Sequence, residues 1–123
     1  MEFINGNNIK IFKNDGVESE QLLFPENSKS ERIAITRVSV APGAIQPRHT
    51  HKTSEQIWIA LEGKGLLLLA DNETKEFIVG DVVRFEDNDV HGLKNESDEV
   101  FKYMSVTSPP INFRKAYIHI EEK

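Results

Sequence analysis

Three of the four histidines in this sequence have a spacing that suits a metal ion. His49 and His51 are separated by one residue, so on an extended strand their side chains project from the same face. Two imidazoles arranged in this way can bind one ion, and imidazole suits iron, nickel, copper, zinc and cobalt. The chain has no cysteine, which excludes disulfides and thiolate ligands. The histidine pair therefore predicts a metal site with nitrogen and oxygen ligands.

The residues around this pair follow a pattern of fixed spacings. Five residues separate Gly43 from His49, four separate His51 from Gln56, and six separate Gln56 from Gly63. This pattern over residues 43–63 resembles the first motif of the cupins, G-x5-H-x-H-x3-4-E-x6-G, with glutamine in place of the glutamate.

Residues 80–95 resemble the second cupin motif, G-x5-P-x-G-x2-H-x3-N. Gly80, His91 and Asn95 match it, while Glu86 and Asn88 replace the proline and the glycine. Both replacements fall in a turn, where asparagine can also adopt left-handed backbone angles. We therefore expect them to affect the shape of the loop more than the ligand His91.

The resemblance implies an all-β fold, an antiparallel double-stranded β-helix (a cupin or jelly-roll barrel) similar to RmlC-like proteins. The sequence shows no linker, internal repeat or low-complexity segment, so we expect one domain over residues 1–123, in which residues 111–123 form a C-terminal extension. The resemblance also implies that His49, His51 and His91 bind one divalent transition metal, and iron, manganese, nickel, cobalt and zinc all remain candidates. A cupin that keeps these histidines as a polar pocket without metal is the alternative.

The fourth ligand is either Gln56 or Glu55. Counting back from Gly63 places Gln56 at the ligand position, whereas Glu55 fits the shorter spacing from His51. Because strand side chains alternate, both cannot point inward from a regular strand. We favour Gln56, and three imidazoles with a neutral amide would leave the ion its full double charge. Such an ion is a good Lewis acid toward a carbonyl or hydroxy-acid oxygen.

The rest of the chain shows short apolar runs separated by turn residues, which is typical of an antiparallel sandwich or barrel. Glu18–Phe24 is the one weak helical candidate. The expected strands are Ile9–Phe12, Arg32–Val40, Gln56–Leu61, Leu66–Ala70, Phe77–Val79, Val82–Phe85, Val100–Thr107 and, as a possible last strand, Ala116–Ile120.

Several other side chains could contribute to a pocket. With Gln56 inward, Trp58 shares its face and forms either an aromatic wall or part of the core. Tyr103 could present its hydroxyl to the pocket, or belong to the core. Arg37 and Arg84 could pair with an anionic substrate, although most strand arginines face solvent. His119 lies outside both motifs and is expected at the surface or in packing, not at the metal.

Composition narrows the function classes. Fifteen basic and twenty acidic residues give a net charge of -5, which argues against a nucleic-acid partner. The longest apolar run, Leu66–Ala70, is too short to span a bilayer, and Met1–Lys10 lacks a secretory pattern. A cytoplasmic protein without membrane association is therefore the expectation.

The expected function is metal-dependent catalysis on a small oxygen-rich molecule such as a sugar acid or keto acid. Whether the chain is an enzyme is left open; isomerase, decarboxylase and iron-dependent dioxygenase activities all occur among proteins of this resemblance. The alternative is a cupin that binds or senses a small ligand or metal without turnover. A homodimer is expected because Ile9–Phe12 and Leu22–Phe24 offer spare apolar area.

Overall fold

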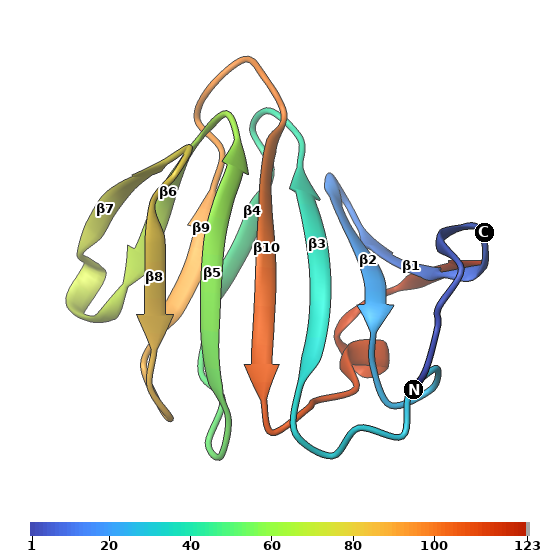
Figure 1. Cartoon of the computed structure of the whole chain (residues 1–123). Coiled ribbons are helices and arrows are strands. Elements are labelled where there is room, and N and C mark those ends of the chain that lie inside the picture. The colour runs from blue at the N-terminus through green and yellow to red at the C-terminus, as the bar shows by residue number, and fades with distance from the viewer. Residues whose placement is uncertain (123) are drawn as a thin grey trace.

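The computed structural model describes residues 1–122 and consists of two antiparallel β-sheets that face each other (Figure 1). The larger sheet has the strand order β11 (His119–Glu122), β1 (Lys10–Asn14), β2 (Val17–Leu23), β3 (Ala34–Val40), β10 (Phe101–Ser108), β5 (Glu55–Glu62) and β8 (Val82–Phe85). The smaller sheet has the order β4 (Ile45–His49), β9 (His91–Lys94), β6 (Lys64–Leu69) and β7 (Thr74–Ile78). Short 3₁₀ helices occur at η1 (Gly6–Asn8), η2 (Ala70–Asn72) and η3 (Phe113–Ala116). The all-β antiparallel fold expected from the sequence is confirmed.

The single-domain assignment over residues 1–123 stays a prediction, and Lys123, which ends both that domain and the extension 111–123, lies outside the described residues.

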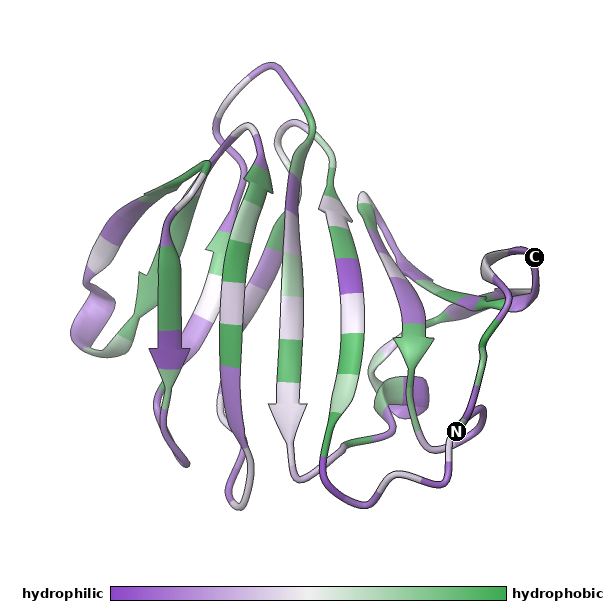
Figure 2. Ribbon diagram, viewed as in Figure 1, coloured by the Kyte–Doolittle hydropathy of each residue, from purple (hydrophilic) through white to green (hydrophobic). Residues whose placement is uncertain are grey.

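Alternating burial along the central strands builds the core. In β3, β5 and β10 every second side chain is buried, and the hydropathy of the ribbon alternates along these strands (Figure 2). Because the strand period is two, the buried side chains of each strand share one face of the larger sheet, and this face lies against the smaller sheet. The main core cluster contains Trp58 and Phe101 from the larger sheet and Leu67 and Leu93 from the smaller one. The inward face of β5 is therefore the face that also carries Gln56.

The expected strands are largely confirmed, but they did not include β4 and β9, and two further segments need correction. Val82–Phe85 is confirmed with its bounds unchanged. The helical expectation for Glu18–Phe24 is wrong: most of this segment is β2, whose residues pair with both β1 and β3. The expected last strand at Ala116 starts only at His119, because Phe113–Ala116 forms η3.

The motif turns adopt the backbone angles that their residues allow. Gly43, Gly63 and Gly80 have φ values of 79°, 80° and 93°, which side chains with a Cβ rarely adopt. Asn88, which replaces the motif glycine, has φ 68°, as asparagine in a turn can. The departure from the motif therefore keeps the turn that leads into β9.

Asn95, the last matched residue of the second motif, has a structural role. It is fully buried, and its Nδ2 donates to the backbone oxygens of Val40 (2.9 Å) and Glu99 (2.7 Å). Its Oδ1 accepts from the backbone N–H of Ser97 at 3.0 Å. This amide ties the end of β9 to the end of β3.

The apolar segments that suggested a dimer are used largely inside the protomer. Phe12, Phe24 and Ala34 form a second buried cluster, against which Phe113 and Tyr117 pack. The homodimer stays a prediction, but this spare area no longer supports it. Among the described residues, no helix has the length and apolar character needed to cross a bilayer.

Gly92 sets how closely β9 can approach β4, the strand that ends at His49. A Cβ at Gly92 would lie 2.6 Å from the backbone oxygen of Gln46 and 3.0 Å from the backbone nitrogen of Arg48. We expect Gly92→Ala to lower the free energy of unfolding by about 1–3 kcal/mol, because backbone atoms would have to shift. Urea denaturation measures this loss.

Gly6→Ala is the matched control, because no atom lies within 4 Å of a Cβ at Gly6. Equal stability of the two variants would show that β4 and β9 do not need this close approach.

Candidate metal centre

Three imidazole rings converge between β4 and β9. His49 is the last residue of β4, His51 follows two residues later, and His91 begins β9 opposite His49 in the strand register. The ring centroids are 4.9 Å apart for His49 and His51, 4.3 Å for His49 and His91, and 5.1 Å for His51 and His91. One ring nitrogen from each histidine lies within 4.8 Å of the other two. The structure thus brings together the three histidines that the motifs single out.

Backbone carbonyls set the tautomer of two of these rings. His49 Nδ1 lies 2.9 Å from the oxygen of Pro47, and His91 Nδ1 lies 2.8 Å from the oxygen of Asp89. A carbonyl oxygen only accepts, so each Nδ1 must carry the hydrogen and donate it. In the neutral ring, Nε2 then keeps an unshared electron pair. This is the arrangement that metal-binding histidines usually have.

The histidine cluster passes a direct test for a metal site. The Nε2 atoms of His51 and His91 are buried, and neither has a hydrogen-bond partner among the described residues. Leaving a buried polar atom without a partner costs about 1–3 kcal/mol, so such atoms are rare unless something binds them. A divalent ion bound to imidazole nitrogen would satisfy both atoms, and the donor set of three imidazoles fits it.

Aromatic rings surround His91, the most buried of the three histidines. Phe85 stacks on His91 with centroids 4.5 Å apart and an interplanar angle of 14°, and Trp58 meets it edge-on at 5.5 Å. Burial lowers the pKa of His91 to about 4, although its hydrogen bond to the backbone of Asp89 opposes the shift. Burial, with a smaller contribution from the nearby His49, also lowers the pKa of His51 to about 4. Both rings are therefore neutral at pH 7 and ready to bind a cation.

Gln56 and Glu55 face opposite sides of β5. Gln56 is 4% exposed and lines the same cavity as His49 and His51, whereas Glu55 is not among the lining residues. The Nε2 of Gln56 donates to Thr107 Oγ1 at 2.9 Å, and its Oε1 accepts from Trp58 Nε1 at 3.2 Å. Glu55 instead forms an exposed ion pair with Arg84 at 2.8 Å. The role of Gln56 as a ligand stays a prediction.

The cavity beside the histidines has a volume of about 310 Å³. Trp58 and Tyr103 belong to its wall and are also almost fully buried, so each belongs to both the pocket and the core. The hydroxyl of Tyr103 donates to Gln46 Oε1 at 2.7 Å. The other polar side chains of the wall are mainly uncharged hydroxyls and amides: Asn14, Ser19, Thr36, Gln46, Gln56 and Ser105. The cavity therefore offers several hydroxyl and amide groups to a small molecule, within a lining that is mainly apolar.

The two arginines proposed for an anionic substrate do not line this cavity. Arg37 forms a two-point ion pair with Glu20 across β3 and β2, and Arg84 pairs with Glu55. Arg48 does line the cavity, but its guanidinium donates to the backbone oxygen of Leu69 at 2.8 Å. His119 is exposed on β11, outside the lining residues, as expected.

Sequence reasoning missed the contribution of the C-terminal extension. Phe113, Ala116 and Tyr117 line the cavity, and the ring of Phe113 lies 5.7 Å from that of His51. They lie outside both motifs, and nothing in their local pattern indicates a place beside residues sixty or more positions earlier.

Comparisons with known proteins agree with this architecture. Residues 36–107 match the family model of the cupin domain. An uncharacterized protein of Methanocaldococcus jannaschii is 32% identical over 96 residues, which cover 78% of this chain and 76% of that protein. The structure of KdgF from Halomonas sp. has a TM-score of 0.75 at 18% identity, covering 91% of this chain and 96% of that one. The polyketide cyclase RemF from Streptomyces resistomycificus has a TM-score of 0.77 at 18% identity, covering 99% and 84%.

The lowered pKa values of His51 and His91 predict how the stability of the metal-free protein depends on pH. Histidine in an unfolded chain titrates at about pH 6.5, so below this pH the unfolded chain binds protons that the two buried rings of the folded chain do not bind. We therefore expect the free energy of unfolding to fall as the pH drops from about 6.5 toward 4, and this contribution to be constant above that window.

Denaturant titrations between pH 5 and 8 measure this slope. The double variant His51→Gln/His91→Gln should show a shallower slope over the same window, because carboxylate effects common to both proteins cancel. Identical slopes would contradict the two buried neutral rings.

Proposed function

The chain belongs to the cupin domain family, and on that premise we propose that it is a divalent-metal-dependent enzyme acting on a small oxygen-rich molecule. The observation that carries the proposal is the pair of buried, unpartnered Nε2 atoms on His51 and His91, in a cluster with His49 whose ring nitrogens lie within 4.8 Å of one another. A sugar acid or keto acid is the proposed substrate class. The uncharged hydroxyl and amide groups of the cavity wall support it.

Three histidines and one amide are the proposed ligands. His49, His51 and His91 would hold the ion through imidazole nitrogen, and the carbonyl oxygen of Gln56 is the proposed fourth donor. That oxygen already accepts a hydrogen bond from Trp58, but an amide oxygen has a second lone pair. The indole N–H of Trp58 only donates, so its bond to Gln56 fixes Oε1 as the acceptor end of the amide.

A bound divalent ion supplies Lewis-acid polarisation of a carbonyl or hydroxy-acid oxygen, and positive charge for a carboxylate. The chain's own residues bind and orient the remainder of the molecule. Hydroxyl groups of Thr36 and Ser105 line the cavity on the inner face of β3 and β10, which pair at these two positions. Trp58 and Tyr103, stacked 4.3 Å apart, form an apolar wall that excludes water from one side.

A second candidate, a cupin that binds a small ligand without turnover, has one observation in its favour. Among the described residues no carboxylate side chain lines the cavity, so none is placed there to act as a general base. An iron-dependent dioxygenase is a third candidate, because it relies on the metal rather than on a protein base. A turnover assay distinguishes the two enzyme candidates from the cupin that only binds a ligand.

Metal affinity tests the ligand set. We expect the purified protein to bind close to one divalent ion per chain, and His51→Ala to lose it. Gln56→Ala should weaken metal affinity by at least about 10–100-fold, because a donor is removed from the ion. Isothermal titration with Zn²⁺ or Co²⁺ measures these affinities.

Glu55→Ala is the matched control, since it removes an outward-facing neighbour on the same strand and should change the affinity less than about twofold. If instead Glu55→Ala weakens metal affinity and Gln56→Ala does not, Glu55 is the ligand. Negligible metal in both the parent and His51→Ala would remove the metal proposal.

Catalysis is tested by incubating the metal-loaded protein with keto acids, uronic acids and phenolic compounds and following each by NMR. We expect at least one keto or uronic acid to be converted, and the conversion to stop in His51→Ala. Saturable binding of such a compound without conversion would instead favour the binding module.

A further inference from the structure

The C-terminal cover, defined here as residues 109–118, crosses the cavity next to the histidines. It follows β10 directly and lies outside the cupin-matched residues 36–107. Phe113 and Tyr117 from this cover line the cavity, and the Phe113 ring meets the half-buried His51 edge-on at 5.7 Å. Because His49 is exposed and His51 partly so, these aromatic side chains stand beside the solvent-facing side of the site.

The far end of the cover is fastened to the last two residues of β1. The side chain of Asn14 donates to the backbone oxygen of Ala116 and accepts from the backbone N–H of Ile118, each at 2.9 Å. The N–H of Ile118, which lies just after η3, also donates to the backbone oxygen of Lys13 at 3.1 Å. Beyond it, β11 pairs with β1 along four residues.

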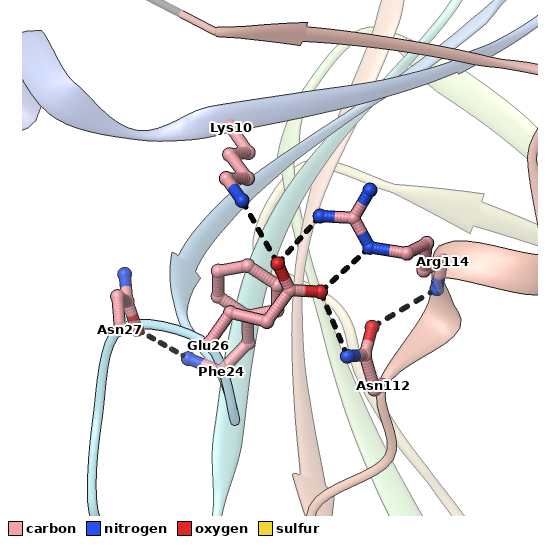
Figure 3. Close-up of polar contacts among 6 residues, drawn as sticks. All are labelled: Lys10, Phe24, Glu26, Asn27, Asn112 and Arg114. Carbon is pink, nitrogen blue, oxygen red and sulfur yellow. Dashed lines mark hydrogen bonds and ion pairs between the residues drawn. The ribbon is translucent and has the colours of Figure 1, made fainter.

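The near end of the cover is fastened by one carboxylate, that of Glu26 (Figure 3). Its two oxygens accept from Arg114 Nε at 2.7 Å and from Arg114 Nη2, from Asn112 Nδ2 at 2.9 Å and from Lys10 Nζ at 2.8 Å. Arg114 holds the pKa of Glu26 well below its usual range, with Lys10 and Asn112 adding to the effect. The carboxylate is therefore ionised at neutral pH, and a two-point pair with arginine fixes direction as well as distance.

The contacts of Glu26 also fix the position of Phe113. Asn112 and Arg114, its immediate neighbours, are both held by Glu26, and Asn112 Oδ1 also caps η3 by accepting from the backbone N–H of Arg114 at 3.1 Å. On the inner side, Phe113 and Tyr117 pack on the buried Phe12 cluster. The ring beside His51 is therefore held from both sides.

Tyr117 brings a polar group to the same wall. It is largely buried, its phenol interacts with Ser19 and Gln46, and burial raises its pKa, so its hydroxyl stays protonated. Tyr117 therefore places a neutral hydroxyl-bearing ring in the cavity wall, next to Phe113 of the same cover.

We propose that Phe113 and Tyr117 are specificity-determining residues of the histidine site, which limit it to small ligands, and that Glu26 is the residue that positions them. This rests on the proposed function, because it concerns ligands that reach a metal held by His49, His51 and His91. A bulky substituent would need the space that Phe113 occupies beside His51.

The test uses the full chain loaded with Co²⁺, whose visible absorption changes when an added anion binds the ion. Acetate, benzoate and 2-naphthoate are carboxylates of increasing size. We expect Phe113→Ala to bind 2-naphthoate roughly tenfold more tightly than the parent does, while its affinity for acetate changes less than about twofold. Phe3→Ala, at an 87% exposed phenylalanine, is the matched control and should leave all three affinities unchanged.

Glu26→Gln tests the positioning role with little change in shape. Releasing the cover should let EDTA remove Co²⁺ roughly fivefold faster, because local opening becomes easier. Glu20→Gln is the matched control, because it weakens a comparable two-point pair, with Arg37, on the outer face of the larger sheet. Its rate of Co²⁺ loss to EDTA should match that of the parent. A thermal unfolding midpoint for each variant shows whether the two glutamine variants are equally folded.

The outcomes separate the two proposals. Absence of Co²⁺ binding in the parent would overturn the proposed function and this inference with it. Normal Co²⁺ binding with the same size preference in the parent and Phe113→Ala would overturn the inference alone. If Glu26→Gln does not fold, the Phe113→Ala and Phe3→Ala comparison still decides whether the cover selects ligands.

Discussion

The site depends on the antiparallel pairing of β4 with β9. This pairing sets His49 opposite His91, and the backbone oxygens of Pro47 and Asp89 then hold the two rings by their Nδ1 atoms. Each of these oxygens belongs to a residue two positions before its histidine. The chain therefore orients both rings by local backbone geometry, while Gly92 allows the two strands to come close enough for the rings to meet.

Burial of the histidines destabilises the metal-free fold and also determines the chemistry of their ring nitrogens. The aromatic walls of Phe85 and Trp58 remove water from His91, which lowers its pKa and leaves its Nε2 without a partner. The same low-dielectric setting would strengthen any interaction with a cation at that point. A feature that destabilises the metal-free fold is thus the one that prepares it to bind an ion, which is common where function and stability compete.

The cavity is assembled from two parts of the chain with different roles. The cupin-matched residues supply the histidines, Gln56 and the hydroxyl-bearing inner face of the larger sheet. The cover supplies Phe113 and Tyr117, held by Glu26 and Asn14, which belong to the N-terminal strands and the loop that follows them. The candidate metal centre therefore belongs to the matched residues, while the cover adds aromatic side chains to the cavity beside it.

The sequence by itself determined the local features. Alternation of period two identified most strands, and fixed spacings identified His49, His51, His91 and the turn at Asn88. Only the tertiary structure decided the rest: that Glu18–Phe24 is mainly strand, that Arg37 and Arg84 pair with glutamates, and that residues 109–118 cover the site. These depend on register and on contacts between distant segments, and a window of neighbouring residues carries no record of which distant strand will lie beside it.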